Sequence, residues 1–278
     1  MLKISEIFYS LQGEGRHMGV PSIFLRTYGC NFQCKGFGMP KGEHSVQADA
    51  IANNGIEYHS YDDLPLVTTG CDSYASWHPK FKHLSPKMTF DEIADRMIEL
   101  LPNNEWGNVH LVITGGEPLL PGWQKLYPEL LKHPKLADLK HITFETNGTQ
   151  VLSEDFENYL YQERRYQTTF SISPKLSVSG ELREHAIKPE VVNEYQFSGY
   201  GSFLKFVVAT EDDVNEALEV MQLYKDKGFK GDIYLMPVGG VDDVYYLNNK
   251  AVAELALKHG LRYSDRLHLP LFGNQWGT

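Results

Sequence analysis

Apolar runs that end at polar or glycine-rich turns recur along the chain. These runs are rich in Val, Ile, Phe and Thr, a composition typical of strands that are covered on both faces. Each is bounded by turn-forming residues, which indicates short, separate elements. We therefore expect strands over residues 21–29, 108–116, 141–148, 168–175, 202–209 and 232–240.

Segments with helical periodicity lie between the expected strands. The first opens with Thr89 and Glu92, which are spaced as a capping box. The second covers residues 212–228 and stops at a glycine, and the third covers residues 248–260. The expected apolar side of the second helix consists of Val214, Ala217, Leu218, Met221 and Leu223.

The alternation of strands and helices predicts an α/β fold with a mostly parallel sheet and outer helices. Six such strands favour a partial β/α barrel. An open Rossmann-type sheet is the alternative, but no GxGxxG motif follows the first expected strand. We expect the whole chain, residues 1–278, to form a single domain.

Residues 35–70 interrupt this alternation of strands and helices, because they are polar, contain several glycines and are weakly periodic. A structureless loop of this length is uncommon inside a compact domain and is often functional. We therefore expect an insertion in a loop, with one short helix at 48–54 as the only candidate element.

Composition excludes several classes of protein. The chain has 278 residues, of which 42% are hydrophobic, so it can bury a substantial core. Its net charge of −10 argues against a general binder of nucleic acid. No apolar run approaches the roughly 20 residues that a membrane span needs, and the first residues do not form a signal peptide. These features predict a cytosolic protein with no membrane or nucleic-acid partner.

Three cysteines are the first candidates for chemistry. Cys30 and Cys34 directly follow the expected strand at 21–29, and Cys71 stands at the far end of the expected insertion. Lengthening a loop costs little closure entropy, so Cys71 can return beside Cys34. Zinc favours four protein ligands in structural sites, whereas three thiolates suit an iron–sulfur cluster with one open iron. Cys30 and Cys34 alone are equally consistent with buried thiols that only pack.

Polar residues gather where expected strands end. Gly115 and Gly116 close the strand at 108–116, where paired glycines allow a close approach of the backbone to a ligand or form an ordinary turn. Because the carboxyl ends of barrel strands meet at one mouth, several such ends predict a polar ligand cradle. The other polar residues at these ends are Glu145, Thr146, Asn147, Ser173 and Lys175.

Arg26 lies in an otherwise apolar strand, so it needs an anionic partner if it is buried. That partner is either a nearby acid or a ligand carboxylate, which Arg can bind with two hydrogen bonds. In the turn at residues 10–15, Gln12 and Glu14 have the donor and acceptor groups that would bind a nitrogen heterocycle. The C-terminal segment 266–278 is either a frayed end or a plug for the barrel.

The order of these motifs resembles the 7-carboxy-7-deazaguanine synthases, a family of radical S-adenosylmethionine (SAM) enzymes of the 7-deazapurine pathway. The motifs are LQGEG, an Arg strand that ends in GC, CDSxxxW, TGGEP, ETxGT and SPK. LQGEG together with CDS and SPK is specific, whereas the cysteines and GGEP occur in much of the radical SAM superfamily. The resemblance covers nearly the whole chain except residues 35–70. It implies a partial barrel of the radical SAM type.

The family resemblance also assigns the cysteines. The usual cluster loop is CxxxCxxC, but Phe37 stands where the third cysteine belongs. Cys71 matches that third position, because Asp72, Ser73 and Trp77 follow it as in the family pattern. The resemblance therefore implies a 4Fe–4S cluster on Cys30, Cys34 and Cys71, with an enlarged loop between the last two. Ser73 would supply a hydroxyl to Mg²⁺.

Further ligand residues follow from the same resemblance. The residues implied to contact SAM are Gly116, Glu117, Ser173, Pro174, Lys175, Met236, Pro237, Val238 and Gly239. The residues implied to hold the pterin substrate are Leu11, Gln12, Gly13, Glu14, Arg26, Thr114, His268 and Thr278.

The implied reaction converts 6-carboxy-5,6,7,8-tetrahydropterin to 7-carboxy-7-deazaguanine with release of ammonia. A radical derived from SAM would take a hydrogen atom from the pterin before the ring contracts. The implied partners are an electron donor such as flavodoxin and a second copy in a homodimer. Another radical SAM enzyme, such as a glycyl-radical activase, is the nearest alternative. A non-enzymatic zinc-binding scaffold is the alternative from a different class.

Overall fold

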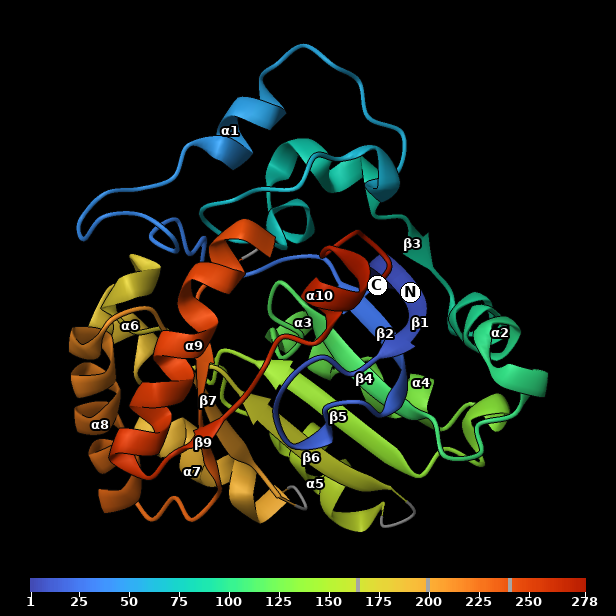
Figure 1. Cartoon of the computed structure of the whole chain (residues 1–278). Helices are drawn as coiled ribbons and strands as arrows, with labels where there is room; N and C mark the ends of the chain where they lie inside the picture. The colour runs from blue at the N-terminus through green and yellow to red at the C-terminus, as the bar shows by residue number, and fades with distance from the viewer. Residues whose placement is uncertain (164–165, 199–200, 240–241) are drawn as a thin grey trace.

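The protein is described by a computed structural model that covers residues 1–163, 166–198, 201–239 and 242–278. Within these residues, one nine-stranded sheet runs through the molecule in the order β3-β1-β2-β4-β5-β6-β7-β8-β9 (Figure 1). The strands are β1 (Leu2–Leu11), β2 (Pro21–Thr27), β3 (Lys87–Met88), β4 (His110–Gly115), β5 (His141–Thr146), β6 (Gln167–Ile172), β7 (Phe203–Val208), β8 (Ile233–Pro237) and β9 (Arg262–Tyr263).

The strand pairing confirms the predicted partial barrel. All neighbours from β2 to β9 pair in parallel, whereas β1 pairs antiparallel with β2 and with β3. Strands β3 and β9 end the sheet on opposite sides, so in the described residues the barrel is open. Each of the six predicted strands is present, and the predicted end at residue 240 lies outside the described residues. The sequence reading missed β1, β3 and β9.

The described residues also form helices, most of which cover the outer side of the sheet. They are α1 (Gln47–Ala52), α2 (Phe90–Leu100), α3 (Pro121–Gln124), α4 (Tyr127–Leu131), α5 (Glu154–Gln162), α6 (Arg183–Ala186), α7 (Pro189–Ser198), α8 (Glu211–Asp226), α9 (Asp242–His259) and α10 (His268–Phe272). Short 3-10 turns occur at Gly15–His17, Tyr61–Asp63, Tyr74–Ser76, Pro79–Leu84, Pro102–Asn104, Pro134–Leu136 and Ser177–Ser179. None of the helices in the described residues is both long and apolar enough to span a membrane.

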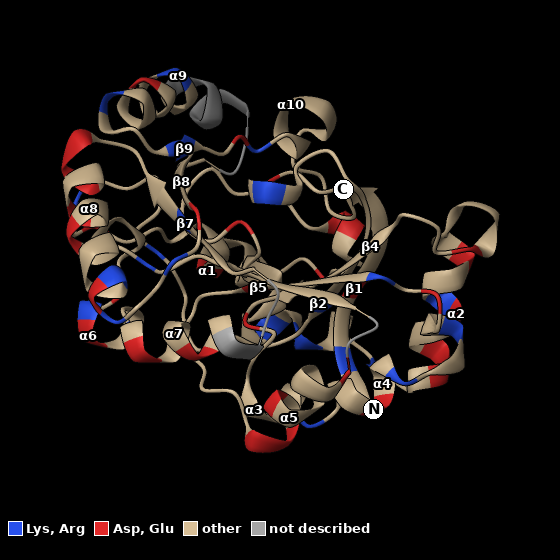
Figure 2. Ribbon diagram, turned by 90° about the horizontal axis from the view of Figure 1, so that it is seen from below, with Lys and Arg blue, Asp and Glu red and all other residues tan. Residues whose placement is uncertain are grey.

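The predicted capping box before α2 is confirmed. The N–H of Glu92 donates to Thr89 Oγ1 at 3.2 Å, and the N–H of Thr89 donates to the Glu92 carboxylate at 2.7 Å. Acidic residues also fill the first turns of α5 and α8, where they complement the positive end of the helix dipole (Figure 2).

The predicted inner face of α8 is wrong at Leu223, which is 41% exposed. Tyr224 is buried in its place, together with Val214, Ala217 and Val220. Tyr224 follows Ala217 by two helical turns, so these two side chains lie on one face, while Leu223 is rotated away from it.

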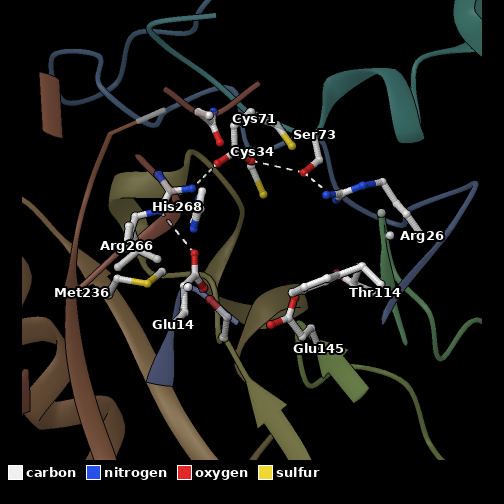
Figure 3. A pocket seen from close by; sticks show the side chains of 18 of the residues that line it. Glu14, Arg26, Cys34, Cys71, Ser73, Thr114, Glu145, Met236, Arg266 and His268 are labelled. Atoms are coloured by element: carbon white, nitrogen blue, oxygen red, sulfur yellow. Dashed lines mark hydrogen bonds and ion pairs between the residues drawn. The ribbon is translucent and has the colours of Figure 1, made fainter. Parts of the chain in front are cut away.

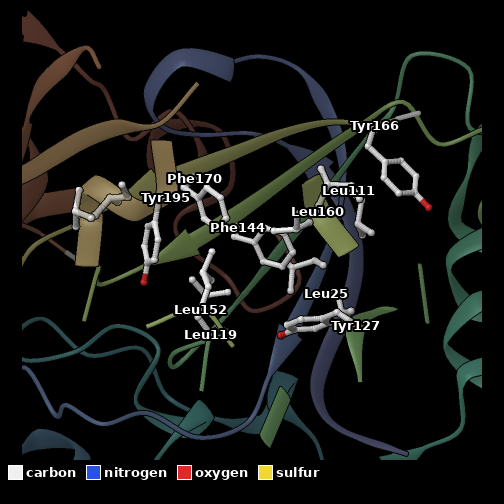
Figure 4. Packing of buried hydrophobic residues seen from close by; sticks show 14 of the residues in the cluster. Leu25, Leu111, Leu119, Tyr127, Phe144, Leu152, Leu160, Tyr166, Phe170 and Tyr195 are labelled. Carbon is white, nitrogen blue, oxygen red and sulfur yellow. The ribbon is translucent and has the colours of Figure 1, made fainter. Parts of the chain in front are cut away.

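Aromatic rings fill the main core between the sheet and the outer helices (Figure 4). The rings of Phe144 in β5 and Phe170 in β6 stack with centroids 5.5 Å apart. Tyr195 of α7 stacks on Phe170 at 4.8 Å, and Tyr127 of α4 packs against Phe144. These buried contacts fix β5 and β6 relative to the helices, and so fix the strand ends that carry polar residues.

The segment that contains the cysteines has a small core of its own. Figure 1 shows it as a layer over one end of the sheet, beside the C-terminal residues. It contains α1, which confirms a short helix near the predicted residues 48–54. We call its apolar cluster the cap core, and its buried members are Tyr58, Tyr61, Leu64, Val67, Tyr74, Ala75 and Phe81. A separate core is consistent with an insertion at 35–70, which stays a prediction.

Candidate active site

One cavity of about 260 Å³ lies at the carboxyl ends of the parallel strands. Successive strands contribute Arg26 from β2, Thr114 from β4, Glu145 from β5 and Met236 from β8, and Ser173 follows β6. This is the edge at which parallel α/β sheets bind ligands. The pocket therefore gathers segments that are far apart in the sequence.

Most residues that the sequence analysis assigned to ligands line this pocket. Those present are Leu11, Gln12, Gly13, Glu14, Arg26, Cys30, Cys34, Cys71, Ser73, Thr114, Gly116, Ser173, Lys175, Met236, Pro237, Val238, Gly239, His268 and Thr278. Glu117 and Pro174 lie in the described part of the chain but outside the lining. Both are buried, so the pocket gives no support to their predicted contact with SAM.

The three cysteines share one side of the pocket. Cys30, Cys34 and Cys71 are free thiols that pack in a small apolar cluster with Phe32 and Ala186. Burial raises the pKa of Cys30 to about 12 and that of Cys71 to about 11, so both stay protonated until a metal replaces the proton. In Figure 3, Cys34 and Cys71 lie across the pocket from Glu14 and Glu145.

A carboxylate outside the pocket holds the first cysteine turn. The backbone N–H groups of Gln33 and Cys34 donate to one Glu181 oxygen at 2.9 and 2.7 Å. Cys34 has a φ of 51°, a left-handed conformation that is costly for a residue with a side chain. Two hydrogen bonds to Glu181 offset part of this cost and fix the direction of the Cys34 side chain.

The two ends of the segment 35–70 lie side by side, with Ser45 between them. The N–H of Ser45 donates to Lys35 O at 2.7 Å, and its hydroxyl donates to Thr69 O at 3.1 Å. Residue 69 is thereby held near residue 35, which explains how Cys71 reaches the pocket beside Cys34.

The second of the paired glycines at the end of β4 lies against the cysteine loop. A Cβ added to Gly116 would lie 2.3 Å from Gly29 O and 2.8 Å from Cys30 Cβ, so only glycine fits. The next N–H, that of Glu117, donates to Gly29 O at 2.8 Å. The motif therefore fixes the start of the cysteine loop as well as lining the pocket.

The Glu117 side chain joins two strand ends. Its buried carboxylate accepts hydrogen bonds from Leu119 N, Thr146 Oγ1 and Asn147 N at 2.8, 2.8 and 2.7 Å. Asn147 in turn donates to the side chain of Asn31, next to Cys30, at 2.8 Å. Burial raises the pKa of Glu117 to about 7 even though these three donors favour the carboxylate. Glu117 is thus a structural link between the ends of β4 and β5 and the cysteine loop.

A buried ion-pair network forms another wall (Figure 3). Lys205 Nζ lies 2.6 Å from a Glu14 oxygen, and Arg266 bridges Glu14 at 3.2 Å and Asp72 at 2.6 Å. Burial opposes ionisation of Glu14, but these two cations hold its pKa well below the usual range. Burial and the adjacent Arg266 lower the pKa of His268 to about 4, so its ring is neutral at pH 7.

Gln12 links this network to a second carboxylate. Its Nε2 donates to Glu145 at 3.1 Å, and its Oε1 accepts from the N–H of Glu14 at 3.0 Å. Lys205 Nζ lies 3.9 Å from Glu145. Glu14 and Glu145 therefore present two acceptor groups to the same cavity.

Arg26 is paired with a neighbouring acid, which is one of the two kinds of partner that the sequence analysis allowed. Its Nε donates to Glu6 at 2.8 Å, and its Nη1 donates to Ser73 Oγ at 3.1 Å. The Ser73 hydroxyl also contacts Asp72 at 3.3 Å. In the described residues, no group of three or more His, Cys, Asp or Glu side chains is arranged to hold a single metal ion.

The sequence analysis missed Glu6, Lys205 and Arg266. The signal that identified Arg26, a charge inside an apolar strand, also marks Lys205 in FLKFVV, whereas LKISEIFYSL mixes polar and apolar residues and so does not single out Glu6. Arg266 has no such signal, because it lies in the irregular C-terminal segment that sequence periodicity does not describe.

Comparison with known proteins identifies the family of the chain. No protein-family model matches the chain. The 7-carboxy-7-deazaguanine synthase of Halobacterium salinarum is 30% identical over 98% of this chain and 91% of its own length. That of Pyrobaculum aerophilum is 26% identical over 99% of this chain and 97% of its own. The crystal structure of QueE from Escherichia coli has the same fold, with a TM-score of 0.53, 21% identity and 96% of this chain and 94% of that chain covered. Similarity of this extent over nearly the whole length of both chains establishes that the protein belongs to the 7-carboxy-7-deazaguanine synthase family.

Proposed function

We propose that the protein converts 6-carboxy-5,6,7,8-tetrahydropterin to 7-carboxy-7-deazaguanine and ammonia, with SAM and a 4Fe–4S cluster as cofactors. The observation that carries this proposal is the placement of three thiols, one buried and two partly buried, and two carboxylate acceptors around one cavity. The synthase family to which the chain belongs favours this reaction over the glycyl-radical activase and the zinc scaffold.

The thiol side of the pocket fits an iron–sulfur cluster. Three thiolates leave one iron of a four-iron cube open for another ligand. The indole Nε1 of Trp77 is buried and pairs with no oxygen or nitrogen among the described residues. It instead approaches Cys71 and favours the thiolate form of that side chain. An N–H directed at a sulfur ligand is one of the features that set the potential of such clusters.

Lys175 supplies a cation beside the cysteines. Its ammonium donates to Ser173 Oγ at 3.0 Å, and its charge offsets a small part of the rise in pKa that burial causes in all three thiols. We propose that Lys175 and Ser173 hold polar groups of SAM, while Gly116 and the turn 236–239 allow a close approach of the backbone. When bound, the cluster and SAM supply the radical that takes a hydrogen atom from the pterin.

The opposite wall suits the pterin ring. The ring carries amino and N–H donors, and Glu14 and Glu145 supply acceptors. Because Lys205 and Arg266 keep Glu14 ionised, its hydrogen bonds to the ring would be charge-assisted. The protein would thereby orient the pterin, and the bound pterin and SAM would fill the pocket and keep water from the reacting carbon.

The substrate carboxylate is assigned to the side of Arg26. We propose that it lies near Arg26 and shares a Mg²⁺ ion with the hydroxyl of Ser73, because this cation prefers oxygen ligands. The support is the position of Ser73 beside Asp72 in the lining. An electron donor such as flavodoxin, a homodimer and a cytosolic location are further proposals, which rest on the resemblance alone.

The test is anaerobic turnover. Reconstituted protein with SAM, a reductant and the carboxytetrahydropterin should give a product lighter by one ammonia, identified by mass. A well-reconstituted cluster that cleaves SAM but gives no deazaguanine would overturn the substrate assignment. Protein that binds zinc, stays colourless under anaerobic conditions and does not cleave SAM would overturn the enzyme assignment.

A further inference from the structure

The last residues of the chain form part of the pocket wall. After α10, the chain turns back at Gly273 and Asn274, both with positive φ, and residues 274–278 line the cavity. The sequence allowed either a frayed end or a plug, and the structure shows the folded-back arrangement. A terminal segment keeps one position only where contacts hold it.

One side chain in this segment, that of Trp276, contacts the cap core. The Trp276 ring packs edge-on against Tyr61 at 5.3 Å and against Tyr74 at 5.7 Å, measured between ring centroids. Its Nε1 donates to Leu64 O at 3.2 Å. Tyr61, Leu64 and Tyr74 are buried members of the cap core, so Trp276 joins the C-terminus to the segment between and after the last two cysteines.

The residue after Trp276 reaches the charged wall. The backbone N–H of Gly277 lies close to the carboxylate of Glu6 and favours its ionised form. Glu6 is paired with Arg26 at 2.8 Å, and Arg26 lines the proposed pterin site. Thr278 follows directly and also lines the cavity. The position of Trp276 therefore determines where Gly277 and Thr278 stand relative to Arg26.

We propose that Trp276 is a positioning residue and that the cap core is the surface that binds it. The cap core holds the indole, and the indole places Gly277 and Thr278 as one wall of the substrate site. This inference rests on the proposed function, because it names the pterin pocket as the site that the tail completes. It also gives the segment at 35–70 a role, which is to build the surface that receives the C-terminus.

Kinetics of Trp276→Ala test the proposal. The KM for the carboxytetrahydropterin should rise about tenfold, as expected when an ordered side chain and tail must be immobilised on each binding event. Cleavage of SAM without substrate should change less than about twofold, because the described contacts of Trp276 and Gly277 are with the cap core and Glu6 rather than with the cysteines. Trp276→Phe should recover part of the loss, since it keeps ring packing but not the hydrogen bond to Leu64 O. Leu271→Ala, an exposed change on α10, is the matched control and should resemble the wild type.

A double-variant cycle separates positioning from folding. Removal of Gly277 and Thr278 should raise the KM by a similar factor, and adding Trp276→Ala to that deletion should cost little more, because both changes abolish the same wall. Multiplicative losses would overturn the proposal. So would a loss of SAM cleavage in Trp276→Ala equal to its loss of pterin turnover.

Carboxypeptidase treatment tests this inference independently of the proposed reaction. The wild-type holoenzyme should release Thr278 slowly, and Trp276→Ala should release it at least about tenfold faster, because only an unanchored end enters a protease. If wild-type protein fails to turn over the pterin but shows this difference, the proposed substrate is wrong and the anchoring stands. Equal release rates from the two proteins would overturn the anchoring itself.

Discussion

The backbone N–H of Gly70 donates a hydrogen bond to the carbonyl oxygen of Phe37 across 2.7 Å. Phe37 stands where a CxxxCxxC loop would carry its third cysteine, and Gly70 directly precedes Cys71. The chain thus leaves the cluster loop at the position of the expected ligand and returns to the same point. The long segment between Cys34 and Cys71 is compatible with one compact cysteine site because this hydrogen bond holds the two ends of the segment together.

The first prediction concerns Cys71. Cys71→Ala should abolish SAM cleavage as fully as Cys30→Ala does, because either change leaves two thiolates, too few to hold a four-iron cube with one open iron. Iron content after anaerobic reconstitution and SAM cleavage are the measurements. A matched control is Ser45→Ala. It removes the hydrogen bond from the Ser45 hydroxyl to Thr69 O but no thiol, so the protein should retain a substantial part of the iron. A normal cluster in Cys71→Ala would show that the ligand assignment is wrong.

The second prediction separates the two roles of Arg26. Arg26→Met leaves the Glu6 charge buried without its partner, which should lower the free energy of unfolding by about 3 kcal/mol. The double variant Arg26→Met with Glu6→Gln should regain most of this stability, because no buried charge is left alone. If Arg26 binds the substrate carboxylate, the KM for the pterin stays raised in both proteins.

Urea unfolding and pterin kinetics on both variants provide the comparison. A double variant with normal stability and a normal KM would restrict Arg26 to its pairing with Glu6. Cleavage of SAM without substrate should persist in both proteins, since the described polar contacts of Arg26 are with Glu6 and Ser73 rather than with a cysteine.

Local patterns predicted the six buried parallel strands because each is an apolar run that is covered on both faces. Strand β1 was not predicted, because LKISEIFYSL mixes polar and apolar residues and pairs with β2 as an antiparallel neighbour. Its register brings Glu6 opposite Arg26. The acid that pairs with Arg26 therefore depended on a strand that the pattern did not reveal.

The candidate site was also predictable only in part from local sequence patterns. Motif order brought Cys71 into the cysteine set, although spacing along the chain argued for Phe37. Contacts between distant segments were not predictable, because no local rule pairs Lys205 with Glu14 or Trp276 with Tyr61. These contacts depend on the closed arrangement of strand ends, loop and C-terminus, which only the folded chain provides.

The third prediction concerns Glu117. Its carboxylate accepts three hydrogen bonds, and Glu117→Gln replaces one acceptor oxygen with an NH₂ group that faces a donor. At least one buried donor then loses its partner, so the free energy of unfolding should fall by about 2 kcal/mol. Because Glu117 links the ends of β4 and β5 to the cysteine loop, reconstituted iron should fall as well. Glu99→Gln on the exposed face of α2 is the control, and equal effects of the two changes would contradict the linking role.

Three histidines pack together at the other end of the strands, where β4 and β5 begin. The rings of His110 and His141 stack with centroids 4.2 Å apart, and His17 packs edge-on against His110 at 5.1 Å. Nδ1 of His110 is buried and has no hydrogen-bond partner among the described residues. Burial and the neighbouring His141 and His17 lower the pKa of His110 to about 4, and Arg16 and Lys140 add positive charge nearby.

The fourth prediction is that acid destabilises the protein through this cluster. The pKa of His110 in the folded chain, about 4, is below the 6.5 of a free imidazole, so the unfolded chain binds more protons between these values. The free energy of unfolding should therefore fall as the pH drops from about 6.5 to about 4, by on the order of 2 kcal/mol because solvent screens part of the penalty. His110→Phe keeps the stacking without a titrating group and should flatten the slope in anaerobic urea unfolding. His185→Phe, at an exposed position, should keep it, and an unchanged slope in His110→Phe would assign the acid sensitivity to other groups.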